Sequence, residues 1–447
     1  MRWTDGAVRE ALGLGAGDRT IPYANLSTDT RRIGPGSLFV ALAGDRFDGH
    51  AFLGTARDAG ATGAVVRAGT PAVPGLTLYP VDDTLRAYGC LARHRRRALA
   101  GPVVAITGTN GKTSTKEMMA AALATRYRVH ATRANLNNLV GVPQTILEAA
   151  DDVEALVVEA GANLPGEIAR YREIIEPSLV IVTNVAAGHL EGFGSLEGVL
   201  AEKLALAREV PVAVVSVDEP ALAAGARRLA GRVVTAGVQG ADVVPDRATL
   251  EASGRATIAV DGVKFTVAQI GLHQARNAML VWAAARELGL DPVAVARALE
   301  SFTIPAGRGE VTEYGPLTIL NDCYNANPAS FLALIDVVRS IRGSRRLVFV
   351  AGTMRELGGD ATRLHGEVAR ALVDLAPDLL AAVGEFGSAL EPWRVQLGDR
   401  LVVADDGPAM GRLLAPRLRG DELVVLKGSR GMALERMIPD LVGRTEP

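Results

Sequence analysis

Residues 104–117 read VAITGTNGKTSTKE, a strand, a glycine turn and the start of a helix. The turn GTNG at 108–111 lets backbone N–H groups face phosphate oxygens, and the helix N-terminus adds its positive end. Lys112 can reach a terminal phosphate, and the hydroxyl of Thr113 can hold Mg²⁺. The stretch therefore predicts a nucleotide-binding loop, although Ile106 occupies the position where the usual loop pattern has a glycine.

Around this loop the chain divides into three sections. Residues 1–99 hold the strand-like runs SLFVALAG, GAVVRAG and LTLYPV and close on a helical stretch over 84–99. Residues 100–304 alternate the apolar strands VVAIT, ALVVEA, LVIVTN and VAVVSV with helices, and include a β-hairpin about Asp261-Gly262. Residues 305–447 repeat the rhythm with TILND, RLVFVAG, LLAAVG, RLVVAD and ELVVLKG.

This alternation predicts an α/β protein of three domains with mostly parallel sheets and with ligands at the carboxyl ends of the strands. We expect an N-terminal α/β domain, a central P-loop-type domain and a C-terminal Rossmann-like domain.

The composition narrows the class of protein. The 447 residues carry a net charge of −2 and two cysteines, which argues against nucleic-acid binding, a disulfide framework and a zinc site. The N-terminus has acids and no apolar signal sequence, and no apolar run approaches a membrane span. We expect a soluble, cytoplasmic monomer that binds no nucleic acid, and a solvated helix face at Arg93–Arg97.

Polar residues follow the strands of the central section. Glu159 ends ALVVE, where a carboxylate suits Mg²⁺ or caps a turn. His189 follows the next strand, and a histidine in such a loop either belongs to a functional site or has no functional role. Asn137 and Asn138 either form a turn or donate to a substrate phosphate or carboxylate.

In the third section NDCYNANPAS (321–330), AGTMRELG (351–358) and KGSRGMALERM (427–437) each follow a strand. The NANP run at 325–328 is either a strand-to-helix corner or part of a site. The basic run at 427–430 suits a carboxylate or phosphate, or is a solvated turn.

Together these motifs resemble the Mur ligase family over nearly the whole chain. TGTNGKTST (107–115), NLNNLVGVP (135–143), VVEAGAN (157–163) and TNVAAGHLEGFGS (183–195) are similar to its central ATPase domain. STDTRRIGPGSLFVALAGDRFDGHAF (27–52) is similar to the domain that receives a UDP-sugar. YNANP (324–328) and KGSRGMALE (427–435) resemble the member that adds D-alanyl-D-alanine to UDP-MurNAc-tripeptide.

The resemblance implies a role for each matching residue. ATP would contact the loop and three later segments, namely Gly108, Thr109, Asn110, Gly111, Lys112, Thr113, Ser114, Asn277, Arg308, Asp322 and Tyr324. Two Mg²⁺ ions would be held by Thr113, Glu159, His189 and Lys203, the last as a carbamate, and Lys112, His189 and Lys203 would be catalytic. The substrates would contact Ser27, Thr30, Arg31, Asp48, Gly49, His50, Asn137, Asn138, Asn325, Asn327, Lys427, Ser429 and Arg430.

The implied domains are a UDP-sugar domain over 1–99, an ATP domain over 100–304 and a dipeptide-binding ligase domain over 305–447. The implied reaction forms a peptide bond through an acyl phosphate with cleavage of ATP to ADP and phosphate. The alternatives are another Mur-type ligase that adds the third residue, a folylpolyglutamate synthase-like enzyme and, from a different class, a P-loop NTPase that is not a ligase.

The chain departs from the family pattern in three places. Gln274 replaces the first asparagine of HNxxN, Thr353 replaces the aspartate of GDMLELG, and Leu204-Ala205-Leu206 follows Lys203 where the family has GEI. By itself, Lys203 is expected to be a lysine on a helix surface.

Overall fold

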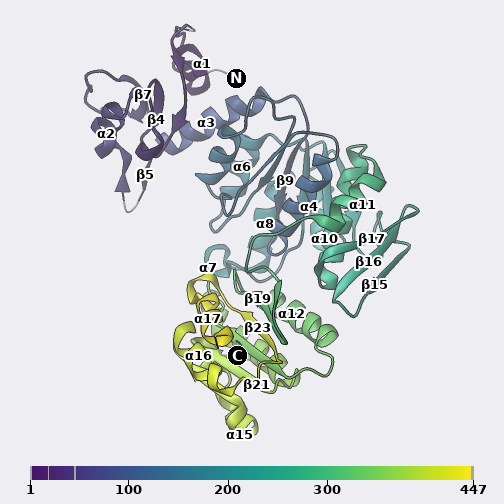
Figure 1. Ribbon diagram of the computed structural model, residues 1–447. Helices are drawn as coiled ribbons and strands as arrows, with labels where there is room; N and C mark the ends of the chain where they lie inside the picture. Colours follow the sequence, from purple (N-terminus) through teal and green to yellow (C-terminus); the bar gives the residue numbers. More distant parts are fainter. Residues whose placement is uncertain (1–2, 19, 45–46, 444–447) are drawn as a thin grey trace. The chain divides into compact units, whose positions relative to one another are not determined.

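A computed structural model of the chain describes residues 3–18, 20–44 and 47–443 (Figure 1). The chain forms two compact units. The first comprises residues 1–106, 126–162 and 166–180, and the second comprises 107–125, 163–165 and 181–447. Within the described ranges, no helix has the length and apolar character that a membrane crossing needs.

The first unit opens with a parallel sheet of order β3-β4-β7-β8. Its side chains alternate between two apolar clusters, with Leu38 and Val65 on one face and Phe39 and Ala64 on the other. The predicted strands over 37–81 and the predicted helix over 84–99 are confirmed. The elements are α1 (Asp5–Leu12), β3 (Leu26–Ser27), β4 (Ser37–Val40), α2 (Leu53–Asp58), β7 (Ala61–Arg67), β8 (Thr77–Val81) and α3 (Thr84–Arg97).

The solvated face predicted at 93–97 is confirmed for Arg93 and Arg97, which are exposed, but is wrong for Arg95, which is buried. Arg95 is 4% exposed and donates to the carbonyl oxygens of Ala149 and Ala150. Arg93 and Arg97 both pair with Glu176 and hold its pKa at about 2, with the Arg97 hydrogen bond as the largest cause. These charges therefore hold α3 against neighbouring segments of the first unit.

The central section builds a six-stranded sheet of order β10-β11-β9-β12-β13-β14. The pairs β10–β11, β11–β9 and β13–β14 are parallel, and the predicted strands are confirmed. The strands are β9 (Val103–Thr107), β10 (Val129–Ala131), β11 (Ala155–Glu159), β12 (Leu179–Val182), β13 (Val212–Ser216) and β14 (Arg232–Ala236). The helices are α4 (Lys112–Ala124), α5 (Gly141–Leu147), α6 (Glu167–Ile175), α7 (Leu190–Phe193), α8 (Leu196–Ala205) and α9 (Pro220–Ala226).

An antiparallel sheet follows in the second unit, made of β15 (Arg247–Leu250), β16 (Arg255–Val260) and β17 (Val263–Ile270). The predicted hairpin is confirmed, because Val260 pairs with Val263 across the turn. The rings of Phe265 and Trp282 stack at 5.4 Å and join this sheet to α10 (Leu272–Glu287). The next helix is α11 (Pro292–Ser301), which lies beside the same sheet (Figure 1).

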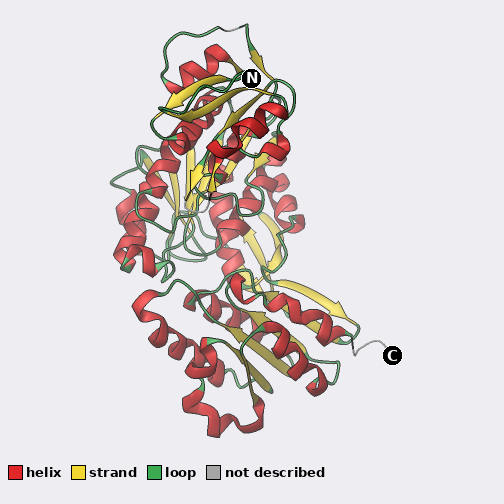
Figure 2. Cartoon of the chain, turned by 90° about the vertical axis from the view of Figure 1, so that its left-hand side faces the viewer, coloured by secondary structure: helices red, strands yellow, loops and turns green. Residues whose placement is uncertain are grey.

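The last section is a six-stranded sheet of order β18-β19-β23-β20-β21-β22, with helices on both faces (Figure 2). β18 is antiparallel to β19 and was not expected from the sequence, whereas the other pairs are parallel. The strands are β18 (Glu310–Tyr314), β19 (Leu317–Asp322), β20 (Leu347–Gly352), β21 (Leu379–Val383), β22 (Leu401–Ala404) and β23 (Leu423–Lys427), and the longer helices are α12 (Pro328–Ile341), α13 (Ala361–Asp374) and α16 (Gly407–Leu414).

This strand order positions the three polar motifs of the third section. β19, β23 and β20 are neighbours, so the loops that leave their carboxyl ends lie side by side. Those loops begin at Cys323, Gly428 and Thr353, where the sequence has its polar motifs.

Candidate active site

The turn at 108–111 joins β9 to α4 as a phosphate-binding loop does. Gly108 has a φ of 144°, and a β-carbon there would overlap the hydroxyl of Thr183. The ammonium group of Lys112 folds back over the turn and donates to the carbonyl oxygens of Gly108 at 2.7 Å and Thr109 at 2.9 Å. The turn at 108–111 therefore bends around the ammonium group of Lys112.

The end of β12 holds the main chain of this loop. Asn184 accepts the N–H of Asn110 through its side-chain oxygen at 2.9 Å. Thr183 and Asn184 both donate to the carbonyl oxygen of Asn110, at 2.6 and 3.0 Å. Asn184 thus holds the main chain of the loop, and its place at the end of a strand marks it in the sequence as a polar residue of this edge.

Side chains of α10 lie against the start of α4. The amide of Gln274 donates to the Ser114 hydroxyl at 3.4 Å and accepts from Asn277 at 3.1 Å. A β-carbon on Gly111 would lie 2.8 Å from the side-chain oxygen of Asn277. Thr113 is 1% exposed in the same turn. Gln274, which departs from the family pattern, therefore links the predicted adenine residue to the loop.

Glu159 ends β11 in the first unit and is 1% exposed. It stands in register with Ile106 of β9, and its carboxylate accepts from the Asn137 amide at 2.8 Å. Asn138 instead accepts the N–H groups of Val140 and Gly141 at 3.1 and 2.8 Å. Of the two asparagines, Asn137 orients the carboxylate and Asn138 forms the turn before α5.

His189 precedes α7 with a φ of 55°. Its Nδ1 lies 2.5 Å from Oε2 of Glu356, at ion-pair distance although not aligned as a hydrogen bond, and this contact holds the pKa of Glu356 below its usual value. Sequence reasoning missed Glu356, although it lies in a polar motif after a strand.

Lys203 lies on α8 and is 1% exposed, so the expectation of a surface lysine is wrong. Its ammonium group lies 5.6 Å from the ring centre of Phe193. Among the residues that the structure describes, no three His, Cys, Asp or Glu side chains gather into a metal-binding group.

Two arginines flank Tyr324 after β19. The guanidinium carbon of Arg308 lies 3.7 Å from the centre of the Tyr324 ring, and that of Arg430 lies 5.0 Å from it. The Nε of Arg308 is buried and has no hydrogen-bond partner among the described residues. The cluster presents two cations at the carboxyl edge of the sheet, a suitable arrangement for phosphate or carboxylate oxygens.

Lys427 and Ser429 are committed to contacts within the protein. The ammonium group of Lys427 is buried and donates to the Asp322 carboxylate at 2.6 Å and to the Asn325 carbonyl at 3.2 Å. The hydroxyl of Ser429 accepts the N–H of Arg355 at 2.9 Å. Both residues therefore brace the loops at this edge, and the solvated-turn alternative for them is wrong.

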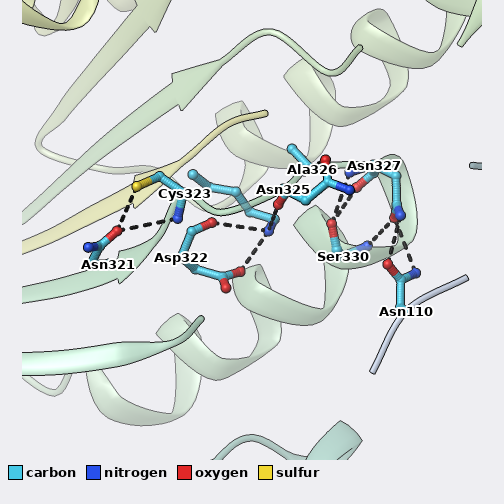
Figure 3. A network of polar contacts seen from close by, with 9 residues as sticks. Asn110, Asn321, Asp322, Cys323, Asn325, Ala326, Asn327 and Ser330 are labelled. Atoms are coloured by element: carbon cyan, nitrogen blue, oxygen red, sulfur yellow. Dashed lines mark hydrogen bonds and ion pairs between the residues drawn. The ribbon is translucent and has the colours of Figure 1, made fainter. Parts of the chain in front are cut away.

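Asn327 caps α12 (Figure 3). Its side-chain oxygen accepts the N–H of Ser330 at 2.9 Å, and its own N–H donates to the Ser330 hydroxyl at 3.0 Å. The NANP motif is thus a strand-to-helix corner, and its last asparagine also contacts Asn110 of the loop.

The predicted UDP-sugar residues of the first unit fall into two groups. The hydroxyl of Ser27 donates to the Asp29 carbonyl at 3.0 Å, and Thr30 begins a 3-10 turn that Asp29 caps. The side chain of Arg31 hydrogen-bonds Asp29, which is the largest cause holding the Asp29 pKa at about 2. Ser27, Thr30 and Arg31 do not line the cavity that Asp48 and His50 line.

Asp48 and His50 line a cavity of about 590 Å³. Nδ1 of His50 lies 2.5 Å from Asp48, and its Nε2 accepts the N–H of Arg67 at 2.8 Å. The Arg67 guanidinium reaches Asp48 at 3.4 Å. Sequence reasoning missed Arg67, the last residue of β7, and Thr70, which follows the strand. The full lining is Asp48, His50, Leu53, Gly54, Arg67, Ala68, Gly69, Thr70, Pro71, Ala72 and Val73.

Gly49→Ala is expected to lower the free energy of unfolding of the N-terminal domain by about 1–3 kcal/mol. A β-carbon there would lie 2.6 Å from the carbonyl oxygen of Leu42, and main-chain atoms cannot move aside cheaply. Thermal denaturation measures the loss. Gly54→Ala is the matched control, because Gly54 is helical and has no atom within 4 Å of the added carbon. Equal stability of the two variants would contradict the packing argument.

Comparison with known proteins gives matches along most of the chain. Family models match residues 22–140 (Mur ligase family, catalytic domain), 106–285 (Mur ligase middle domain) and 307–430 (Mur ligase, glutamate ligase domain).

The relatives that match include ligases that align with this chain over nearly their whole length. The UDP-N-acetylmuramoyl-tripeptide–D-alanyl-D-alanine ligase of Bacillus subtilis is 32% identical over 425 residues, which cover 93% of each chain. A crystal structure of MurF from Acinetobacter baumannii has a TM-score of 0.89 and 28% identity over 99% of each chain. MurF from Thermotoga maritima, solved in complex with ADP, has a TM-score of 0.84 and 26% identity over 94% of this chain and 98% of its own.

Proposed function

The chain belongs to the Mur ligase family, and we propose that it joins D-alanyl-D-alanine to UDP-MurNAc-tripeptide with cleavage of ATP to ADP and phosphate. The observation that carries this proposal is the likeness to a ligase of that name, 32% identical over 93% of both chains. The three-domain α/β fold and its mostly parallel sheets agree with the MurF structures.

In this proposal each of the three domains binds one substrate. Residues 1–99 would hold the UDP-sugar, 100–304 the ATP and 305–447 the incoming dipeptide. The cavity lined by His50, Asp48 and Arg67 supports the first assignment, since it offers hydrogen-bond donors and acceptors in a concave site.

The reaction begins when the terminal carboxylate of the tripeptide attacks the γ-phosphorus of ATP. An O–P bond forms, the bond to ADP breaks, and an acyl phosphate results. The amine of D-alanyl-D-alanine then forms the C–N bond and loses a proton, while phosphate leaves. Such transfers need mainly positioning and neutralisation of charge. Lys112 supplies a positive charge at the loop, and Arg308 and Arg430 supply two more at the edge of the third-domain sheet.

Two of the predicted metal residues fit a hard cation, because the buried Thr113 hydroxyl and Glu159 carboxylate are oxygen donors. They would hold one Mg²⁺, and His189 with a carbamylated Lys203 would hold a second. The ions would neutralise phosphate charge when bound. Asn137 would keep the Glu159 carboxylate oriented, and Glu356 would hold Nδ1 of His189 so that Nε2 faces the ion.

We also propose the remaining predicted contacts with ATP. Tyr324, flanked by the two arginines, would line the ATP beside Asp322, and Asn277 would face adenine. We place the enzyme in the cytoplasm, where ATP and UDP-linked precursors occur, as a monomer that acts on small molecules and binds no nucleic acid.

Release of phosphate from ATP tests this function. The full chain is expected to release phosphate only when UDP-MurNAc-tripeptide and D-alanyl-D-alanine are both present, with a product heavier than the tripeptide by the dipeptide less water. Tripeptides that end in diaminopimelate and in lysine are both needed, because the sequence does not distinguish them. Turnover with a free amino acid on a shorter substrate would indicate another Mur-type ligase. Turnover that ignores both substrates would indicate an NTPase.

A further inference from the structure

Two asparagines from distant parts of the chain form a reciprocal pair (Figure 3). The amide of Asn327 donates to the side-chain oxygen of Asn110 at 2.7 Å, and the amide of Asn110 donates back at 3.3 Å. Asn327 is 7% exposed, and its oxygen also accepts the N–H of Ser330 at the start of α12. One buried side chain therefore holds the loop at 108–111 and the first turn of α12 together.

Neither partner is free to turn. The main chain of Asn110 is fixed by Asn184 and Thr183, as described above. Gly188 leaves little room on the same side, because a β-carbon there would lie 2.7 Å from Thr109 and 3.7 Å from the Asn327 amide. A shift of the loop would therefore move the cap of α12 or break the pair.

The same segment carries the two-arginine cluster. Residues 322–327 are anchored at one end by Lys427, which donates to the Asp322 carboxylate and to the Asn325 carbonyl, and at the other end by Asn327. Tyr324, which stacks on Arg308, lies between these anchors. The position of the cluster therefore depends on both ends of the segment.

We infer that Asn327 is a positioning residue that couples nucleotide bound on the loop at 108–111 to the orientation of segment 322–327 and of α12. The inference rests on the proposed function only in that this loop binds nucleotide. Asn327 acts through Asn110 and Tyr324, and no direct contact of Asn327 with a substrate is needed.

Aspartate at 327 separates this role from helix capping. Asn327→Asp keeps an oxygen for the Ser330 N–H, and aspartate caps helices as well as asparagine does. It loses the shorter bond, which Asn327 donates to Asn110 at 2.7 Å, and places a carboxylate oxygen against the Asn110 oxygen. Only the longer bond, which Asn110 donates at 3.3 Å, can remain. Ser330→Ala is the matched control, since it removes the hydroxyl from the capping box and leaves the asparagine pair intact.

Hydrogen–deuterium exchange of the full chain with and without ADP and Mg²⁺ tests the inference. In the unaltered chain, ADP is expected to slow exchange over 107–124 and in the first turns of α12. In Asn327→Asp the slowing over 107–124 is expected to persist, while that in α12 is lost. Ser330→Ala is expected to respond to ADP as the unaltered chain does. Asn110→Ala, which leaves the α12 cap in place, is expected to lose the α12 response as well and serves if Asn327→Asp does not fold.

Ligase turnover gives a second readout. Asn327→Asp is expected to lower kcat/KM by about tenfold, which corresponds to the net free energy of one to two neutral hydrogen bonds. The inference would be overturned if ADP did not slow exchange in α12 of the unaltered chain. It would also be overturned if ADP slowed exchange in α12 equally well in Asn327→Asp and Asn110→Ala. Absence of amide product from the unaltered chain would instead refute the proposed function, because the exchange experiment needs only ADP.

Discussion

Replacement of Lys112 by alanine is expected to lower the rate of ATP-dependent amide formation by about 10³-fold or more, with little change in thermal stability. Under the proposed function the loop at 108–111 would hold the phosphates, and Lys112 would offset negative charge there as the phosphoryl group is transferred. Its ammonium group donates to the carbonyl oxygens of Gly108 and Thr109 in its own loop. The main chain of the loop is held separately by Asn184 and Thr183, so the fold is expected to survive removal of the side chain.

Turnover of both substrates, measured by phosphate release and product mass, gives the rate. Lys264→Ala is the matched control, since Lys264 is an exposed lysine on β17 of the same unit. It is expected to keep the unaltered rate. A Lys112→Ala enzyme within a few-fold of that rate would mean that the phosphates bind elsewhere.

Replacement of Glu422 by alanine is expected to lower the free energy of unfolding of the third domain by about 3–5 kcal/mol. This carboxylate has no exposed surface. It accepts from the Arg346 guanidinium at 2.7 Å and from the N–H groups of Arg419 and Gly420 at 2.7 and 2.9 Å. Alanine would leave a partly buried guanidinium and three N–H groups, those of Arg419, Gly420 and Asp421, without this partner. Their desolvation would then no longer be offset by a hydrogen bond to the carboxylate.

Urea denaturation at neutral pH measures this loss, and Glu313→Ala, at an exposed site on β18, is the control expected to be nearly neutral. Burial alone would raise the pKa of Glu422, but its hydrogen bonds outweigh burial and lower it. Because the folded pKa lies below that of the unfolded chain, the stabilisation is complete above about pH 4.5 and is lost as the pH falls through the folded value. A Glu422→Ala loss below about 1 kcal/mol would contradict this account.

The strands and the loop were predictable because their signals are local. Apolar runs such as VVAIT and LVVLK need burial on both faces, and a glycine turn before a lysine leaves few alternatives. The sheet edge that carries the motifs was also predictable, since parallel strands bring their carboxyl ends together. β18 escaped prediction because EVTEY is mostly polar and pairs along only one edge.

The expectations that failed concern charged side chains. Arg95, Lys203 and Lys427 were each expected on a surface or in a solvated turn under one interpretation, and each is buried. A buried charge is stable only where hydrogen-bond or ion-pair partners surround it. The partner of Arg95 lies 54 residues away in the chain, and that of Lys427 lies 105 residues away. No local pattern reveals such partners.

The sequence alone determined the α/β class, most of the strands, the glycine turn between β9 and α4 and the likeness to a ligase family, because each is written in residues close together. The tertiary structure decided which of the marked residues face one another. It paired Asn110 with Asn327 across 217 residues, His189 with Glu356, and Tyr324 with two arginines. The physical reason is that such contacts depend on how whole strands and helices pack, so an amide or a carboxylate shows its role only when its partner is in place.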